Sequence, residues 1–183
     1  MRIVGGSRRG RQLLPPRSAA TRPTSDRVRE SLFNVLGQRL AGGDVLDLYA
    51  GTGALGLEAL SRGAERALLV DEAPEAAELC RRNAETLGFD SQASVLRVRV
   101  ERAVERLERE GRRFSLAFAD PPYAARVGSW VVGAVGVLLT EGATLAVEHD
   151  RREVLPQAAG ALLRVDERRF GDTVLSFYRA TPP

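Results

Sequence analysis

The chain has 183 residues and a mass of 19.8 kDa, which corresponds to one domain with at most a short appendage. With 44% hydrophobic and 28% charged residues it can build a core, so global disorder is excluded. Its 27 basic residues, all arginine, exceed the 24 acidic ones only slightly, and this balance alone does not indicate a nucleic-acid partner. A single cysteine and a single histidine exclude a disulfide framework and a zinc site built from these ligands, and we predict no metal.

No segment has the pattern of a signal or a membrane span. The N-terminus lacks the apolar core of a secretory signal, and the longest apolar run, residues 127–139, is shorter than the roughly 20 residues that a span needs. We therefore expect a soluble, cytoplasmic protein without membrane contacts, and we expect it to be a monomer.

Residues 1–23 are predicted to form a basic arm. Six arginines and no acid occur in residues 1–24, so with a total charge of +3 the rest of the chain sums to −3. Two short runs, residues 2–4 and 12–14, flank a Gly-Gly-Ser turn and predict a small β-hairpin that ends at two prolines. Basic N-terminal arms often contact nucleic acid. On charge alone, a solvated tail is an equal alternative.

From residue 24 to residue 183, apolar spacing and turn signals predict alternating helices and strands. Helices are expected at about 26–40, 54–61, 74–87, 101–110 and up to 139, with a short helix after 148, and strands at 45–49, 67–70, 95–100, 114–119, 143–148, 162–170 and 174–178. This order predicts one α/β domain with a Rossmann-like, mostly parallel sheet, helices on both faces and an antiparallel C-terminal strand. Ligands of such sheets bind beyond the carboxyl ends of the strands.

A glycine-rich turn follows the first predicted strand. Gly51, Gly53 and Gly56 form G-x-G-x-x-G between a strand and a helix, and Asp71 ends the next strand 20 residues after Gly51. Such glycines let the backbone approach a nucleotide cofactor, while the acid binds ribose hydroxyls. Asp47, four residues before Gly51, would repel the pyrophosphate of NAD and suits a cationic cofactor such as S-adenosylmethionine. The alternative is a tight turn that binds nothing.

The tetrapeptide Asp120-Pro121-Pro122-Tyr123 follows the fourth predicted strand. Prolines lack the N–H that a central strand needs, and their carbonyl oxygens stay available as acceptors. A carboxylate and a proline carbonyl together suit methylation of an exocyclic amine, because two acceptors that hold its N–H groups aim the nitrogen lone pair at the methyl group. Tyr123 would stack on an unstacked base. The alternative is a proline-stiffened surface loop.

The combination of D-x-x-x-G-x-G with D-P-P-Y resembles the class I, S-adenosylmethionine-dependent amino-methyltransferases. Residues 2–6, 9–11, 47–59 and above all 22–34 (R-P-T-S-D-R-V-R-E-S-L-F-N) resemble the RsmD family, and the resemblance extends over residues 1–178. That family methylates the N2 amine of one guanine in 16S ribosomal RNA. The resemblance therefore implies S-adenosylmethionine as cofactor and 16S rRNA, or the assembling small ribosomal subunit, as partner.

The resemblance also implies roles for individual residues. The amine site would be Asp120 to Tyr123, and Arg102 with its neighbours stands where the family often has an Asp or Asn that faces the adenine. The implied cofactor contacts are Asp47, Tyr49, Gly51, Thr52, Gly53, Asp71, Glu101, Arg102 and Ala103. The candidates for RNA contacts are Arg8, Arg9, Arg11, Arg22 and Arg27.

Three alternatives stay open at this point. The same site could act on another amine, either adenine N6 in RNA or DNA or a protein glutamine. The chain could instead be a non-catalytic RNA-binding protein with this fold, or a nicotinamide dehydrogenase, against which Asp47 and the D-P-P-Y turn speak. His149 is expected to be structural or at the surface, since amine methylation needs no histidine, and Cys80 is expected in the core.

Overall fold

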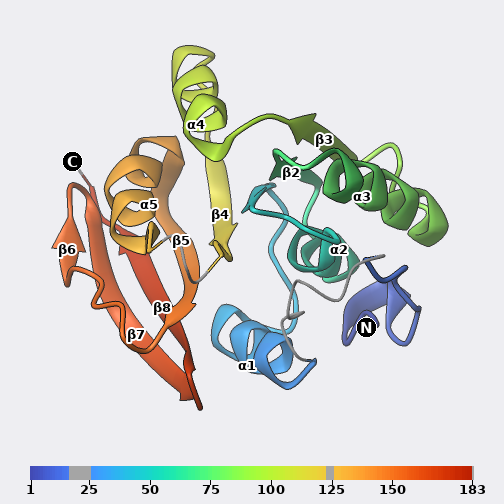
Figure 1. Ribbon diagram of the computed structural model, residues 1–183, viewed down its shortest axis with the longest axis horizontal. Helices are drawn as coiled ribbons and strands as arrows, with labels where there is room; N and C mark the ends of the chain where they lie inside the picture. The colour runs from blue at the N-terminus through green and yellow to red at the C-terminus, as the bar shows by residue number, and fades with distance from the viewer. Residues whose placement is uncertain (17–25, 123–125, 183) are drawn as a thin grey trace. The chain divides into compact units, whose positions relative to one another are not determined.

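The computed structural model describes residues 1–16, 26–122 and 126–182, which divide into two compact units, Met1–Val100 and Glu101–Pro183 (Figure 1). Within the described ranges, no helix is both long and apolar enough to cross a membrane. The boundary predicted at residue 23 lies outside the described residues and stays a prediction.

The first unit is built on three strands that pair in parallel in the order β3-β2-β1. Residues 45–48 of β1 are all buried, which means that both faces of this strand are covered. Because the strands are parallel, the loops that follow β1 and β2 meet at one edge of the sheet. Its elements are η1 (Gly6–Arg8), α1 (Asp26–Leu36), β1 (Asp44–Leu48), α2 (Ala54–Ser61), β2 (Arg66–Asp71), α3 (Pro74–Leu87) and β3 (Ala93–Arg97).

The N-terminal arm, here residues 1–16, packs against α2 (Figure 1, blue). The predicted hairpin takes the form of a single antiparallel bridge between Arg2 and Gln12, and the residues between them include the 3-10 turn η1. Ile3 and Leu13 are buried in the core of this unit. Apolar burial therefore fixes a segment whose charge alone would leave it in solvent.

The second unit has strands in the order β4-β5-β8-β7-β6. β4 and β5 are parallel, and the remaining pairs are antiparallel, so the predicted antiparallel C-terminal strand is confirmed and has two further antiparallel neighbours. The elements are α4 (Val100–Arg109), β4 (Phe114–Ala119), α5 (Gly128–Val135), η3 (Gly136–Leu138), β5 (Leu139–Asp150), β6 (Ala158–Ala159), β7 (Leu162–Phe170) and β8 (Thr173–Ala180).

Two boundaries in the first unit differ from the sequence prediction. α1 ends at Leu36 and not near residue 40, because Gly37 adopts a positive φ of 103° that stops the helix. β3 stops short of residue 100, where α4 already begins, because Arg97 pairs with Asp71, the last residue of the neighbouring strand β2.

The predicted helix after residue 148 is wrong. β5 continues to Asp150, whose carboxylate accepts the N–H of Arg152 at 2.8 Å and so forms a turn in place of a helix start. The chain then adds the short strand β6 beside β7. The preceding helix, predicted to continue to residue 139, ends earlier: α5 stops at Val135, and the 3-10 turn η3 connects it to β5.

Candidate functional site

Glycines shape the loop between β1 and α2, which we call the glycine loop (residues 49–53). Gly53 precedes α2 with a φ of 77° and Gly51 has a φ of 56°, conformations that other residues rarely adopt. A Cβ on Gly56 would overlap the Cδ2 atom of Leu69, so the missing side chain lets α2 lie directly against β2. Backbone conformation and packing therefore account for all three glycines of the motif.

The glycine loop borders open space at Gly51. Apart from its chain neighbours, the only atom of the described residues that a Cβ on Gly51 would meet is the Tyr49 carbonyl oxygen, at 3.9 Å. Tyr49 itself has a positive φ of 60°, a strain of roughly 1–3 kcal/mol that is typical of ligand sites. Gly51, Tyr49 and the half-buried Thr52 therefore leave room for a small molecule to approach the main chain.

Of the two predicted carboxylates, Asp71 binds the glycine loop and Asp47 binds the start of α2. Asp71 accepts the N–H groups of Gly51 and Ala73, each at 2.9 Å, one on each carboxylate oxygen. It is half-buried, and since a carboxylate offers about four lone-pair sites, it keeps acceptors for ribose hydroxyls. Asp47 is only 1% exposed and accepts the Gly56 N–H at 2.8 Å. Asp47 therefore fixes the first turn of α2 and contributes a buried negative charge beside the glycine loop.

Helix α3 supports the glycine loop with two side chains. The Cys80 thiol donates to the Gly51 carbonyl oxygen at 3.4 Å, and Asn83 Nδ2 donates to the Thr52 carbonyl oxygen at 2.9 Å. Both side chains are fully buried, which confirms the core position predicted for Cys80. Asn83 was missed by sequence reasoning. Its signal was present, since it is an amide on the otherwise apolar face of α3.

The loop lies in a negative electrostatic environment. Burial, followed by the charges of Asp47 and Asp71, raises the pKa of the Cys80 thiol. The field that disfavours a thiolate here also disfavours a phosphate and favours a cation. The open backbone, the ribose acceptors and this field therefore fit S-adenosylmethionine, which carries a positive sulfonium, better than they fit the pyrophosphate of NAD.

The predicted amine site lies in the second unit. Asp120 directly follows the last residue of β4, Ala119, and is half-buried, while Pro121 is buried and Pro122 is exposed. The two prolines end the strand at its carboxyl end, where the sequence placed them. Tyr123 lies outside the described residues, so its stacking role stays a prediction.

The predicted adenine contacts lie at the start of α4. Glu101 is half-buried in the first turn, and Ala103 is fully buried. The exposed Arg102 side chain forms an ion pair with Glu105 at 3.0 Å on the helix surface. The burial of these residues and the ion pair of Arg102 do not test an adenine contact, which stays a prediction.

The candidate RNA-contacting arginines differ in their surroundings. Arg8 is half-buried, donates its Nε–H to the Leu87 carbonyl oxygen at 2.7 Å, and lies over the Phe89 ring at 5.1 Å. Arg9 and Arg11 are exposed, and neither pairs with an acid in the described part of the chain. Among the two others, Arg27 is exposed on α1, and Arg22 lies outside the described residues.

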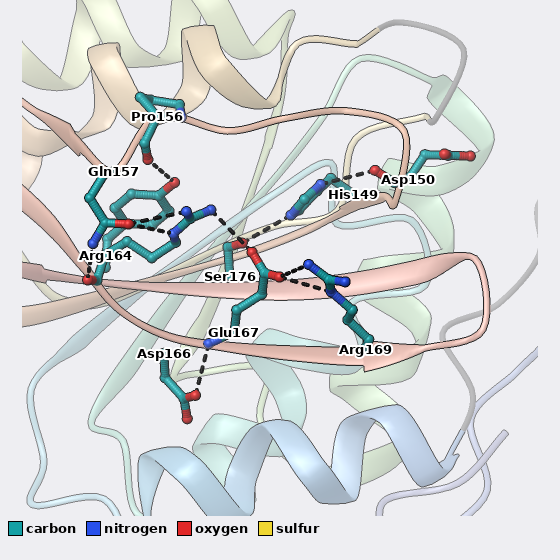
Figure 2. A network of polar contacts seen from close by, with 10 residues as sticks. His149, Asp150, Pro156, Gln157, Arg164, Asp166, Glu167, Arg169 and Ser176 are labelled. Atoms are coloured by element: carbon teal, nitrogen blue, oxygen red, sulfur yellow. Dashed lines mark hydrogen bonds and ion pairs between the residues drawn. The ribbon is translucent and has the colours of Figure 1, made fainter.

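His149 joins β5 to β8 in a polar network (Figure 2). Its Nδ1 lies 3.1 Å from the Asp150 carbonyl oxygen and its Nε2 lies 2.9 Å from Ser176 Oγ. A carbonyl only accepts, so Nδ1 carries the proton and Nε2 accepts from the hydroxyl. Burial lowers the pKa of this imidazole. A neutral histidine with both nitrogens bonded within the sheet fits the structural role predicted for it.

Comparisons with known proteins extend over nearly the whole chain. The model of the family described as "Conserved hypothetical protein 95" matches residues 1–179. The chain is 36% identical over 181 residues to "Putative rRNA methyltransferase YlbH" of Bacillus subtilis, with 98% of each chain covered. It is 42% identical over 123 residues to "Ribosomal RNA small subunit methyltransferase D" of Escherichia coli, which covers 67% of this chain and 60% of that protein. The solved structure "Putative methyltransferase yhhF from Escherichia coli" matches with a TM-score of 0.86 and 32% identity, covering 100% of this chain and 99% of that one.

Proposed function

Because the chain belongs to the RsmD family and has the class I methyltransferase fold, we propose that it transfers a methyl group from S-adenosylmethionine to the N2 amine of a guanine in 16S rRNA. The names of its relatives support methylation of small-subunit ribosomal RNA. The observation that carries the choice of an amine is the Asp120-Pro121-Pro122 turn at the carboxyl end of β4.

The first unit would bind the cofactor. When bound, S-adenosylmethionine supplies a methyl group on a positively charged sulfur, from which a nucleophile can take it. Asp71 would accept hydrogen bonds from the ribose hydroxyls, because its two oxygens are held toward the glycine loop by the N–H groups of Gly51 and Ala73. The buried charge of Asp47 favours a cation at the loop, and the open side of Gly51 lets the ligand lie against the backbone.

The second unit would hold the amine. The nitrogen lone pair of an exocyclic amine is delocalised into the base, so the amine is a weak nucleophile. The Asp120 carboxylate and the Pro121 carbonyl would each accept one N–H, which turns the lone pair out of the ring plane and toward the methyl group. Positive charge then develops on the nitrogen, and the carboxylate stabilises it and accepts the released proton.

The exposed arm arginines would contact the RNA backbone. Arg9 and Arg11 extend from a segment whose main chain is bonded to α2 of the first unit, and Arg27 would add a third cation. Arg8 is used by the fold itself, because its guanidinium donates to the end of α3. We therefore assign phosphate contacts to Arg9 and Arg11 and a structural role to Arg8.

Variants of Asp120 test this function. Asp120→Ala should lower the rate of methyl transfer to small subunits that lack the modification by about 10²–10⁴-fold, because positioning and deprotonation of the amine are both lost. Cofactor affinity, measured by calorimetry, should stay unchanged. The matched control is Asp172→Asn, whose carboxylate forms an exposed pair with Arg151 and should keep full activity. Near-normal turnover of Asp120→Ala would contradict the proposal.

A further inference from the structure

One buried amide in the first unit serves both the N-terminal arm and the glycine loop. Asn83 Oδ1 accepts the N–H of Leu14 at 2.7 Å, and Asn83 Nδ2 lies 3.4 Å from the Leu14 carbonyl oxygen. The same Nδ2 donates to the Thr52 carbonyl oxygen at 2.9 Å. The Asn83 side chain is fully buried, so all of these groups depend on one rotamer of one residue.

The arm is held to the rest of the unit at points away from Asn83. Glu58 accepts the N–H groups of Val4 and Gly5, and Ser61 Oγ accepts the N–H of Arg8 at 2.9 Å. These contacts attach the arm to α2. The hydrogen bonds of Leu14 instead connect the far end of the arm to α3, beside the glycine loop.

A second contact joins the arm to the same loop residue. Thr52 Oγ1 lies 3.6 Å from Met1 Sδ, so both ends of the arm reach Thr52, one directly and the other through Asn83. Arg9 and Arg11, the exposed cations of the arm, lie between these ends. A polyanion bound to Arg9 and Arg11 would therefore restrain the segment that positions Asn83.

We infer that Asn83 is a positioning residue that couples RNA contact by the arm to the cofactor loop, so that RNA and S-adenosylmethionine each raise the affinity of the protein for the other. This rests on the proposed function. A ligand that binds the arm makes its local opening rarer and so keeps Asn83 in the rotamer that bonds Thr52, which leaves the second ligand less to order. Coupling of this kind is reciprocal between the two ligands.

Two substitutions break the connection at different points. Asn83→Ala removes the bonds to both Leu14 and Thr52. Leu14→Pro removes only the N–H that Asn83 accepts and leaves the bond from Asn83 to the loop in place, so it remains informative if Asn83→Ala fails to fold. The matched control is Ser61→Ala, which removes hydrogen bonds to Arg8 and Gly5 on the α2 side without touching Asn83.

The measurement is the dissociation constant of S-adenosylhomocysteine, which cannot transfer a methyl group, with and without unmodified small subunits. For the unsubstituted protein and for Ser61→Ala we expect the subunits to tighten binding by about 5-fold or more, within the usual range of coupling. In Asn83→Ala and in Leu14→Pro the ratio should fall to within about 2-fold of unity. Labelling of the Cys80 thiol should become faster in Asn83→Ala, because the glycine loop that its thiol contacts then loses the hydrogen bond to Thr52 and opens more often.

Two results would overturn the inference: equal affinities with and without subunits in the unsubstituted protein, or full coupling retained in Leu14→Pro. Either result with normal methyl transfer leaves the proposed function intact and removes only the coupling. Absence of methyl transfer by the unsubstituted protein would instead contradict the proposed function, so the two failures are distinguishable.

Discussion

The fold of the first unit depends on Glu58, a fully buried carboxylate on α2. It accepts the N–H groups of Val4 and Gly5 at 2.8 and 2.7 Å and pairs with Arg62 Nε at 2.8 Å. Glu58→Gln keeps the shape of the side chain but removes its charge, and it turns an amide NH₂ toward at least one of three donors. The substitution therefore leaves a buried donor unpaired and the Arg62 guanidinium without its counter-ion.

Removal of one partner of a buried ion pair costs about 3–5 kcal/mol of unfolding free energy. Arg62 keeps its bond to Gln38 and its position over the Phe33 ring, so we expect the lower end of that range. For a chain of this size about 3 kcal/mol corresponds to a fall in Tm of roughly 6–12 °C. The N-terminal arm should loosen as well, because two of its N–H groups lose a charged acceptor.

Thermal and urea unfolding measure the loss of stability, and amide hydrogen exchange at Val4 and Gly5 measures release of the arm. The matched control is Glu105→Gln, which breaks an exposed ion pair with Arg102 and should change stability by less than about 0.5 kcal/mol. A Tm for Glu58→Gln as high as that of the control, with unchanged exchange at both amides, would refute the reasoning.

Three further predictions concern packing, pH and RNA binding. Gly56→Ala should lower the unfolding free energy by about 1–3 kcal/mol in urea titrations, because the added Cβ overlaps Leu69; unchanged stability would mean that α2 can move away from β2. Burial lowers the pKa of His149 from 6.5, so as pH falls through that value the unfolded chain binds a proton that the folded chain does not, and the unfolding free energy decreases. His149→Gln should flatten this dependence of the unfolding free energy on pH, and the same dependence in the variant would contradict the prediction. Replacing Arg9 and Arg11 by Gln should reduce the slope of log affinity for RNA against log salt by about 0.7–0.9 for each phosphate that is no longer neutralised, with cofactor affinity in the absence of RNA unchanged; a fall in that affinity would place the arginines in the cofactor pocket.

The sequence predicted the glycine loop because each glycine has a local cause that spacing reveals. Gly51 and Gly53 need a positive φ, and Gly56 lies where a helix must approach a strand. The alternation of elements predicted the parallel core for the same reason, since period and turn residues are local signals. The end of α1 at Leu36 was also marked locally, by Gly37, but the apolar spacing continues past it as far as Leu40.

The remaining features depend on contacts between distant residues. Nothing near Glu58 in the sequence indicates that it binds the main chain of Val4 and Gly5, more than fifty positions away. A turn forms at Asp150 in place of the predicted helix because the Asp150 carboxylate accepts hydrogen bonds from the main chain and the guanidinium of Arg152. The sequence marks Asn83 as an amide on an apolar helix face but not its partners, which come from the arm and from the glycine loop. Charge predicted a basic arm, and the fold adds that one of its arginines, Arg8, also bonds to α3.

The most direct test of the proposed function is the identity of the methylated product. Small subunits that lack the modification would be incubated with the protein and labelled S-adenosylmethionine, and their 16S rRNA would be digested to nucleosides and analysed by mass spectrometry. We expect the label in N2-methylguanosine. Label in N6-methyladenosine or in a ribosomal protein, or no transfer at all under conditions where S-adenosylmethionine binds, would contradict it.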